Sequence, residues 1–233
     1  AVDPSAPVAV HQLYGTLPQT AQDAAMTPAP PGTRKVILAT SIAESSLTIE
    51  GIRVVVDSGM ARVPRFSPRT GMTRLATVRV SRASADQRRG RAGRTAPGVC
   101  YRLWHASEDA TLVPRATPEI LEADLAPLAL ELAIRGVSDP AELAWLDQPP
   151  AAALKEARSL LTQLGALDGA GRATAHGRAM AEVGAHPRLA HLLLRGQAMG
   201  ALPQAALLAA LLEDRDCLHR PGGPPDASIR LRL

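Results

Sequence analysis

Residues 35–59, with the sequence KVILATSIAESSLTIEGIRVVVDSG, carry the pattern that decides the fold. A short apolar run at 35–39 leads into a polar segment rich in Ser, Thr and Glu, and a second apolar run follows at 52–56. Short apolar runs bounded by turn residues are typical of strands buried on both faces of a parallel sheet. We therefore predict an α/β sheet, in which functional groups collect at the carboxyl ends of the strands.

Strand and helix signals continue on both sides of this stretch. We expect a strand at 7–13 and a helix at 18–26 before it, and a helix at 84–91 and a strand at 99–104 after it. Between 61 and 80, two strand-like segments flank the turn residues SPRTGM, which predicts a two-stranded ribbon. Four arginines occupy outward positions of this ribbon: Arg62, Arg65, Arg74 and Arg79.

The pattern becomes helical from about residue 118. Residues 150–164 begin with Pro and are followed by Gly165, as expected for a helix. The Gly-rich segment 165–180 reads as a short hairpin running into a helix, and Leu-rich runs at 189–194 and 207–212 predict further helical structure. An apolar stripe near the 3.6-residue helical period consists of Leu125, Leu128, Leu132 and Val137.

Composition narrows the class of protein. Aromatic residues make up only 2% of the 233 residues, so aliphatic side chains must fill the core. Neither a run of eighteen apolar residues nor a basic segment followed by an apolar stretch occurs, so we predict no membrane span, no signal peptide and a cytoplasmic protein. Cys100 and Cys217 lack metal-site spacing, so we read both as reduced thiols and expect no metal site.

The net charge differs between the two parts of the chain. Residues 1–105 contain 14 Lys and Arg against 6 Asp and Glu, a net charge of +8, whereas residues 106–233 contain 12 against 16, a net charge of −4. The basic part is therefore the expected partner of phosphates.

The most informative motif is QRRGRAGR, residues 87–94. If 84–91 is helical, Gln87 and Arg91 lie on one face, with Arg94 just past the helix end. Arginine stays charged and presents a planar fork of donors, so a pair of arginines suits an anionic phosphoryl group. Gly90 and Gly93 would let a phosphate approach the backbone closely. The alternative is a basic helix with solvated arginines.

This motif matches the last helicase motif of the DEAH-box/RNA helicase A group of superfamily 2, and the chain resembles the C-terminal RecA-like lobe of that group. The resemblance implies that Gln87, Arg91 and Arg94 face the γ-phosphate of ATP, with Arg91 or Arg94 as the arginine finger. Such a finger accelerates phosphoryl transfer by about 10³ to 10⁵. For Arg88, structural pairing and phosphate contact both remain open.

The segment after residue 39 resembles the fifth motif of the group. A polar segment that leaves a buried strand exposes N–H groups and hydroxyls to phosphates. The resemblance implies that Thr40 and Ser41 contact the RNA backbone, and that Thr48 and Glu50 lie near the nucleotide and couple the two sites. Ser41 stands where Asn is usual, and Glu50 where many members have Asp. For Glu44 and the two serines after it, we favour helix capping and a solvated face.

Two weaker similarities accompany these motifs. The loop LYGTLP, residues 13–18, resembles the hook-like loop of the group, in which Gly15 and Thr16 would contact a phosphate; alternatively, they form a strand-to-helix turn. The predicted ribbon resembles a hairpin that lies near the duplex junction in this family. Surface arginines on an edge ribbon also deter strand pairing, so both roles are compatible there.

The resemblance extends over nearly the whole chain and implies three domains. We expect a RecA-like lobe, incomplete at its N-terminus, at 1–105, a winged-helix domain at 106–170, and the truncated start of a ratchet-like helical bundle at 171–233. The segment LLEDRD at 211–216 indicates a bacterial branch of the group.

Two parts of a complete motor do not occur in the sequence, namely a GxxxxGK[ST] phosphate-binding loop and an acidic Mg²⁺ motif. We therefore predict part of an ATP-dependent RNA helicase that uses ATP and Mg²⁺ only when full length, together with the missing N-terminal RecA-like lobe. The chain alone should bind neither and should not hydrolyse ATP. The alternatives are a stand-alone, non-catalytic nucleic-acid-binding module and a non-functional gene fragment.

Overall fold

The computed structural model describes residues 5–45, 49–68, 70–94 and 96–213. The chain divides into two compact units, residues 1–117 (unit 1) and 118–233 (unit 2), and each is described by itself. The division lies beyond residue 105, where the predicted lobe ends. Hydrogen bonds explain this, because Glu108 and Asp109 accept from Arg79 and Arg102, and the N–H of Arg82 donates to the carbonyl of Val113.

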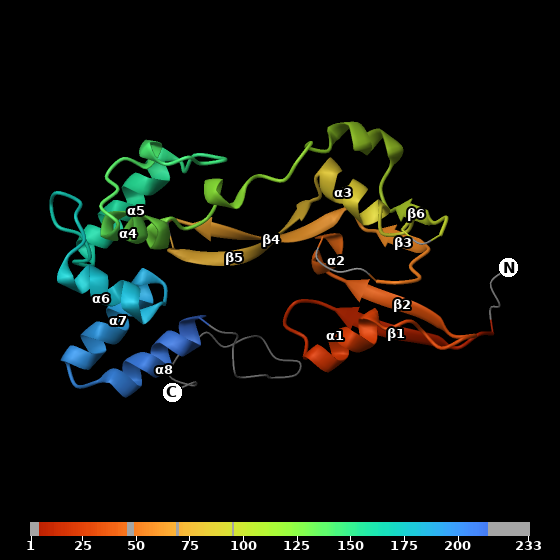
Figure 1. The fold of residues 1–233 in the computed structure, drawn as a ribbon, viewed down its shortest axis with the longest axis horizontal. Helices are drawn as coiled ribbons and strands as arrows, with labels where there is room; N and C mark the ends of the chain where they lie inside the picture. Colours follow the sequence, from red (N-terminus) through yellow and green to blue (C-terminus); the bar gives the residue numbers. More distant parts are fainter. Residues whose placement is uncertain (1–4, 46–48, 69, 95, 214–233) are drawn as a thin grey trace. The chain divides into compact units, whose positions relative to one another are not determined.

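Unit 1 contains two parallel strand pairs and one antiparallel hairpin (Figure 1). The parallel pairs are β1 (Val8–Leu13) with β2 (Arg34–Ala39) and β3 (Val54–Asp57) with β6 (Val99–Arg102). The hairpin consists of β4 (Met60–Ser67) and β5 (Met72–Arg79). The remaining elements of unit 1 are α1 (Gln19–Met26), α2 (Ile42–Ser45), α3 (Arg82–Arg89) and the 3-10 helix η1 (Ala106–Thr111).

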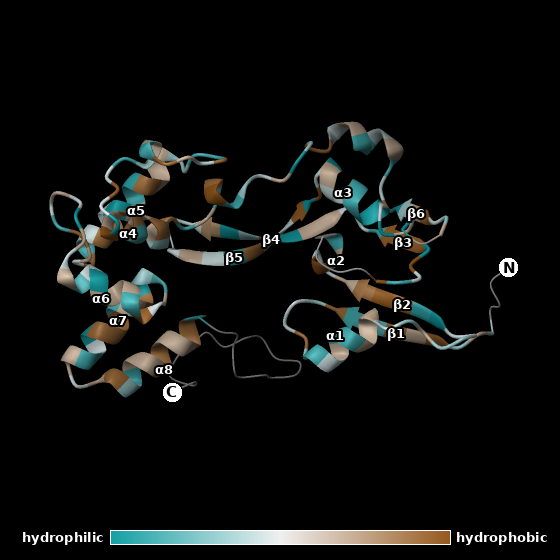
Figure 2. Cartoon of the chain, in the orientation of Figure 1, coloured by the Kyte–Doolittle hydropathy of each residue, from teal (hydrophilic) through white to brown (hydrophobic). Residues whose placement is uncertain are grey.

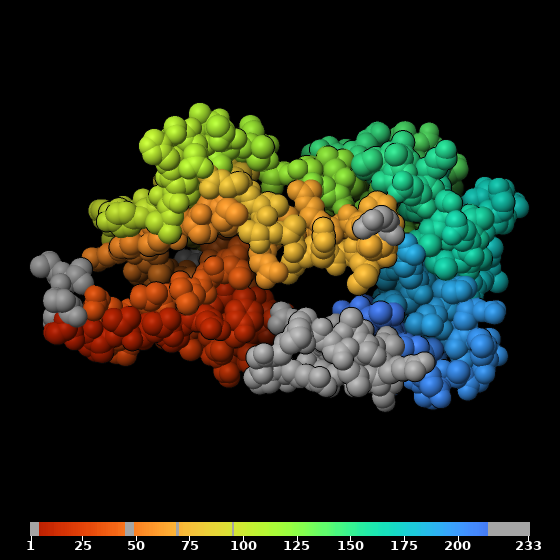
Figure 3. Space-filling view, turned by 180° about the vertical axis from the view of Figure 1, so that it is seen from behind, coloured from red at the N-terminus to blue at the C-terminus, as the bar shows by residue number. Residues whose placement is uncertain are grey.

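The predicted strands form, but their predicted burial on both faces is wrong. Val36, Leu38, Val54 and Val56 are between 43% and 62% exposed. The strands belong to two separate pairs, and the described part of unit 1 covers the apolar runs incompletely, so these side chains remain at the surface. Figure 2 shows the hydrophobic colour of β2 and β3, and Figure 3 shows β1 and α1 (red) beside β2 (orange) in the space-filling view.

The predicted ribbon is confirmed, with β4 and β5 in continuous antiparallel register from Met60↔Arg79 to Ser67↔Met72. Arg62, Arg74 and Arg79 are exposed, whereas Arg65 is half-buried. Arg79 forms an ion pair with Glu108 at 2.8 Å.

Helix α3 begins and ends two residues earlier than the sequence pattern predicts. The Ser81 hydroxyl accepts a hydrogen bond from the N–H of Ser84 at 3.2 Å and caps the helix start. After Arg89, the N–H groups of Arg91 and Ala92 bond to carbonyls three residues back, so the chain continues in turns. Arg91 therefore lies just beyond the helix rather than within it.

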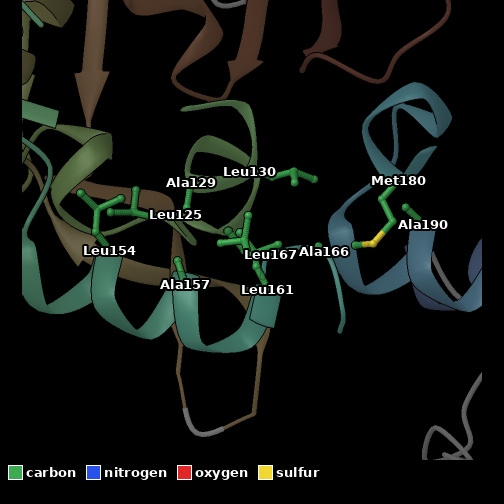
Figure 4. Close-up of a cluster of buried hydrophobic side chains, with 11 residues drawn as sticks. Leu125, Ala129, Leu130, Leu154, Ala157, Leu161, Ala166, Leu167, Met180 and Ala190 are labelled. Atoms are coloured by element: carbon green, nitrogen blue, oxygen red, sulfur yellow. The ribbon is translucent and has the colours of Figure 1, made fainter. Parts of the chain in front are cut away.

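Unit 2 is helical. Its α-helices are α4 (Ala126–Ile134), α5 (Ala151–Gln163), α6 (Ala175–Val183), α7 (Pro187–Ala198) and α8 (Leu202–Glu213), with the 3-10 helices η2 (Glu119–Leu121) and η3 (Pro140–Glu142). Leu154, Ala157 and Leu161 of α5 face buried residues of α4, while Met180 of α6 lies beside Ala190 of α7 (Figure 4). The core is aliphatic, as the composition predicts, and runs continuously across the predicted domain boundary at residue 170.

The Gly-rich segment before α6 is a short hairpin closed by an antiparallel bridge between Leu167 and Ala173. Asp168 holds its turn by accepting from the N–H groups of Ala170 and Arg172, each at 2.9 Å. Among the helices that the structure describes, none is both long and apolar enough to cross a membrane.

Candidate nucleotide and nucleic-acid site

The predicted nucleic-acid contacts meet at one edge of unit 1. Because β1 and β2 are parallel and Leu13 pairs with Ala39, both strands end at the same place. The N–H of Thr40 donates to the carbonyl of Leu13 at 3.0 Å, which brings Thr40 beside the loop that contains Gly15 and Thr16. All three residues are exposed, as is Ser41. The edge therefore presents hydroxyls and main-chain groups from two loops.

This edge continues directly into α2. The N–H groups of Ala43 and Glu44 donate to the carbonyls of Thr40 and Ser41, at 3.2 and 2.9 Å. The main chain of the Thr40 loop and that of α2 therefore form one hydrogen-bonded turn. The turn in the LYGTLP loop is also present, since the N–H of Leu17 donates to the carbonyl of Tyr14 at 3.2 Å.

The arginine motif lies against α2. Gln87 and Arg94 are exposed and Arg91 is half-buried. The guanidinium of Arg91 donates through Nη2 to the main-chain carbonyl of Glu44. Burial lowers the pKa of Arg91, and the nearby positive charge of Arg94 lowers it further. The negative charge of Glu44 acts in the opposite direction on the pKa of Arg91.

Arg88 is enclosed by carboxylates. Its Nη1 donates to Oδ1 of Asp57 at 2.7 Å, and its Nη2 and Nε lie 2.6 and 2.8 Å from Oε1 of Glu44. Nη1 also donates to the carbonyl of Met60 at 3.1 Å. Burial opposes its charge, but these carboxylates raise the pKa of Arg88 overall. Of the two roles left open for Arg88, the structure shows structural pairing.

The prediction that Glu44 lies on a solvated face is wrong. Its side chain is only 14% exposed, because it accepts from Arg88 and from the hydroxyl of Ser84. Sequence reasoning missed this, since the partners lie 40 and 44 residues away in the chain. Of the two serines after Glu44, the side chain of Ser45 and the whole of Ser46 lie outside the described residues.

Asp57 is a second residue that the sequence reasoning passed over. It is 2% exposed at the end of β3, where Oδ1 also accepts from the N–H of Gly59 at 2.9 Å. Gly59 has a φ of 73°, so the turn needs a residue without a Cβ. The DSG sequence at 57–59, an acid and a glycine directly after a strand, was the available signal.

The remaining predicted site residues are less informative. Thr48 lies outside the described residues, and Glu50 is exposed in the turn before β3. Gly90 has a φ of −62°, so its own conformation does not require glycine. The described residues contain no group of three His, Cys, Asp or Glu that could hold a metal ion.

The helicase conserved C-terminal domain matches residues 4–96. The chain is 51% identical over 202 residues to the ATP-dependent RNA helicase HrpB of Escherichia coli, covering 87% of this chain and 25% of that protein. It is 40% identical over 210 residues to the pre-mRNA-splicing factor ATP-dependent RNA helicase prp22 of Schizosaccharomyces pombe, covering 90% of this chain and 18% of that protein.

Two crystal structures of Escherichia coli HrpB share the fold. One, described as a DExH-box NTPase, has a TM-score of 0.81 at 48% identity, covering 92% of this chain and 26% of that one. The other, described as a DEAH/RHA helicase, has a TM-score of 0.84 at 49% identity, covering 91% and 27%. The chain therefore spans about a quarter of the length of the HrpB proteins that it matches.

Residues 4–96 carry the helicase conserved C-terminal domain, of RecA-like fold, and the chain is similar in sequence and structure to helicases of the DEAH-box/RNA helicase A group. Within that group its similarity is to the HrpB type.

Proposed function

We propose that this chain supplies the second RecA-like lobe of an ATP-dependent RNA helicase. In this proposal Arg91 and Arg94 stabilise the charge that develops on the γ-phosphate, with one of them as the arginine finger. Gln87 donates a hydrogen bond from its amide N–H to the same phosphoryl group. The observation that carries the proposal is the position of the arginine motif, which lies within the matched helicase domain and is held against α2 by the hydrogen bond from Arg91 to the carbonyl of Glu44.

The nucleotide requires a second surface. The given sequence contains no phosphate-binding loop, so we assign the β- and γ-phosphates to another RecA-like lobe that carries one. The described residues contain no group of three His, Cys, Asp or Glu that could bind Mg²⁺. We therefore assign the Mg²⁺ ligands to that lobe and to the phosphates. Gly90, Thr48 and Glu50 would lie on the nucleotide side of this chain.

The RNA backbone would lie along the edge formed by the two loops. Thr40 and Ser41 from one loop, and Gly15 and Thr16 from the other, offer hydroxyl and N–H donors to phosphates and sugars. Serine at position 41 gives one hydroxyl donor where an asparagine would give two amide donors. Because these contacts reach the backbone and not base edges, binding should be largely independent of sequence.

Unit 2 would hold the accessory domains. Of the winged-helix domain predicted at 106–170, we assign to unit 2 the part that begins at residue 118, with the hairpin closed by Leu167 and Ala173 as its wing, followed by the start of a helical bundle at 171–233. The hairpin between two helices supports this assignment.

The decisive test complements this chain with a separately expressed HrpB-type lobe that carries the phosphate-binding loop. ATPase activity should appear only in the mixture, and Arg94→Ala should lower turnover by about 10³-fold or more. Arg89→Ala is the matched control, because Arg89 is an exposed arginine of the same motif that pairs with Asp86 instead of lying against α2. This control should retain turnover.

Two outcomes would contradict the proposal. If Arg94→Ala and Arg91→Ala both leave turnover unchanged, the finger assignment is wrong. If the mixture binds RNA but never hydrolyses ATP, the chain is a non-catalytic nucleic-acid-binding module.

A further inference from the structure

Three segments that lie far apart in the sequence converge on Glu44 and Arg88. Glu44 belongs to the turn that follows Thr40, Arg88 belongs to α3, and Asp57 ends β3. Arg88 bridges both carboxylates within 2.8 Å, and the side chains of Arg88 and Glu44 are 16% and 14% exposed. Ion pairs with so little solvent around them hold their geometry far better than surface pairs do.

Glu44 carries a second connection, through its main chain. While its carboxylate holds Arg88 and Ser84 of α3, its carbonyl accepts from Arg91. A main-chain acceptor cannot move independently of the backbone, so the position of the Arg91 guanidinium follows the position of α2. In turn, α2 is hydrogen-bonded to the carbonyls of Thr40 and Ser41.

From this arrangement we propose that Glu44 and Arg88 are positioning residues, which transmit the placement of the Thr40–Ser41 loop on nucleic acid to the guanidinium of Arg91. The inference rests on the proposed function and deepens it, because it names the connection by which RNA regulates ATP hydrolysis at the arginine site. Asp57 anchors Arg88 to the sheet, since Asp57 is buried at the end of β3 and pairs with Nη1 of Arg88, whereas Glu44 pairs with Nη2 and Nε.

The connection depends on the guanidinium shape of Arg88. Its three nitrogens reach two carboxylates and the carbonyl of Met60 at once. A lysine ammonium is a point charge and cannot span these acceptors in the same way. Arg88→Lys should therefore keep the buried positive charge while loosening the link between α2 and β3.

Unit 1 offers a matched control on the other side of α3. Asp86 pairs with Arg102 of β6 at 2.8 Å, and so also anchors α3 to a strand through one carboxylate. It contacts neither α2 nor Arg91 in any hydrogen bond or ion pair that the structure describes. Asp86→Asn thus weakens the anchorage of α3 without cutting the proposed connection.

The test measures how strongly RNA stimulates ATP hydrolysis in the complemented protein, with single-stranded polyuridine RNA as the probe. Glu44→Gln and Arg88→Lys should each lower the ratio of RNA-stimulated to basal turnover by about tenfold. Asp86→Asn should lower the melting temperature but keep that ratio within about twofold of wild type. Should Glu44→Gln fail to fold, Arg88→Lys carries the test.

Two results would overturn the inference. A wild-type stimulation ratio in folded Glu44→Gln and Arg88→Lys would show that the link transmits nothing. An equal fall in the Asp86→Asn protein would show that general softening of unit 1 is responsible. Arg94→Ala in the same assay distinguishes a failure of this inference from a failure of the proposed function. If Arg94→Ala abolishes turnover while Glu44→Gln and Arg88→Lys keep the wild-type stimulation ratio, the positioning role is wrong and the proposed function stands.

Discussion

At the scale of single residues, arginines of one short motif differ sharply in environment. Arg88 is held by two carboxylates, Arg91 lies on a main-chain carbonyl, and Arg94 is exposed. Their spacing along the turn that ends α3 produces this difference, because each successive position points to a different neighbour. One residue type in one motif therefore serves both the scaffold and the proposed site.

Gly98 shows how tightly the chain packs behind this motif. A Cβ at this position would lie 1.8 Å from the carbonyl oxygen of Ala92 and 2.8 Å from that of Arg53. Both are main-chain atoms, so neither can rotate away. Gly98→Ala should lower the free energy of unfolding by about 1–3 kcal/mol or more, measured by urea denaturation.

Gly93→Ala is the control for this prediction. Among the described residues, apart from its two chain neighbours, no atom lies within 4 Å of where a Cβ on Gly93 would be, and its φ is not positive. Equal stability losses in the two variants would show that the close approach at Gly98 is not the cause.

At the scale of elements, α6 and α7 bring together two histidines that lie 15 positions apart in the sequence. Nε2 of His176 lies 3.0 Å from Nδ1 of His191, and the rings meet edge to face. Burial lowers the pKa of His191, and the charges of His176 and Arg195 lower it further. His186 caps α7 by accepting from the N–H of Arg188 and also pairs with Asp124 at 3.0 Å.

The histidine pair predicts a pH dependence of stability. Because the folded state lowers the pKa of His191, the unfolded chain binds more protons near that pKa. The contribution of His191 to the free energy of unfolding should therefore be complete above about pH 6.5 and should decline as the pH falls below that value. The effect should stay under about 1 kcal/mol, because the group is only partly buried. Unfolding midpoints at pH 8 and pH 5.5 measure it.

His191→Asn should flatten this slope while changing stability little at pH 8. An unchanged slope between the two pH values in that variant would assign the dependence to other groups.

At the scale of the whole molecule, charge separates the two parts of the chain. The net charge is +8 over residues 1–105 and −4 over residues 106–233. Association with RNA should therefore depend on the first part and weaken as salt rises, because binding releases counterions from the phosphates.

The salt dependence can be assigned to unit 1 by a paired substitution. Replacing the exposed Arg62 and Arg74 of the hairpin with alanine should reduce the slope of log K against log salt by about 1.4 for single-stranded RNA, if both contact phosphates. Replacing Arg135 and Arg172 of unit 2 changes the net charge equally and should leave the slope unchanged. Fluorescence anisotropy over a salt series measures the slope for each double variant. Equal slopes in the two double variants would rule out a phosphate role for the hairpin.

Local patterns in the sequence were sufficient for the order of elements. The apolar runs, the ribbon at 61–80 and the helix at 150–164 recur in the structure within a few residues. Periodicity and turn residues act over short distances along the chain, so they can be read without knowing the fold. The start of α3 was predicted two residues too late because its cap, Ser81, precedes the segment on which the prediction was based.

By itself the sequence determined the class of protein and the helicase motif QRRGRAGR, and it led us to expect Thr40 at the RNA backbone and Arg91 at the γ-phosphate, because motif spacing and residue chemistry are properties of the chain. Only the tertiary structure decided which groups meet. Glu44 holds Arg88 across 44 positions, Asp57 holds it across 31, and apolar side chains of β2 and β3 remain at the surface. Contacts over such separations depend on how strands and helices pack, and no local pattern encodes that packing.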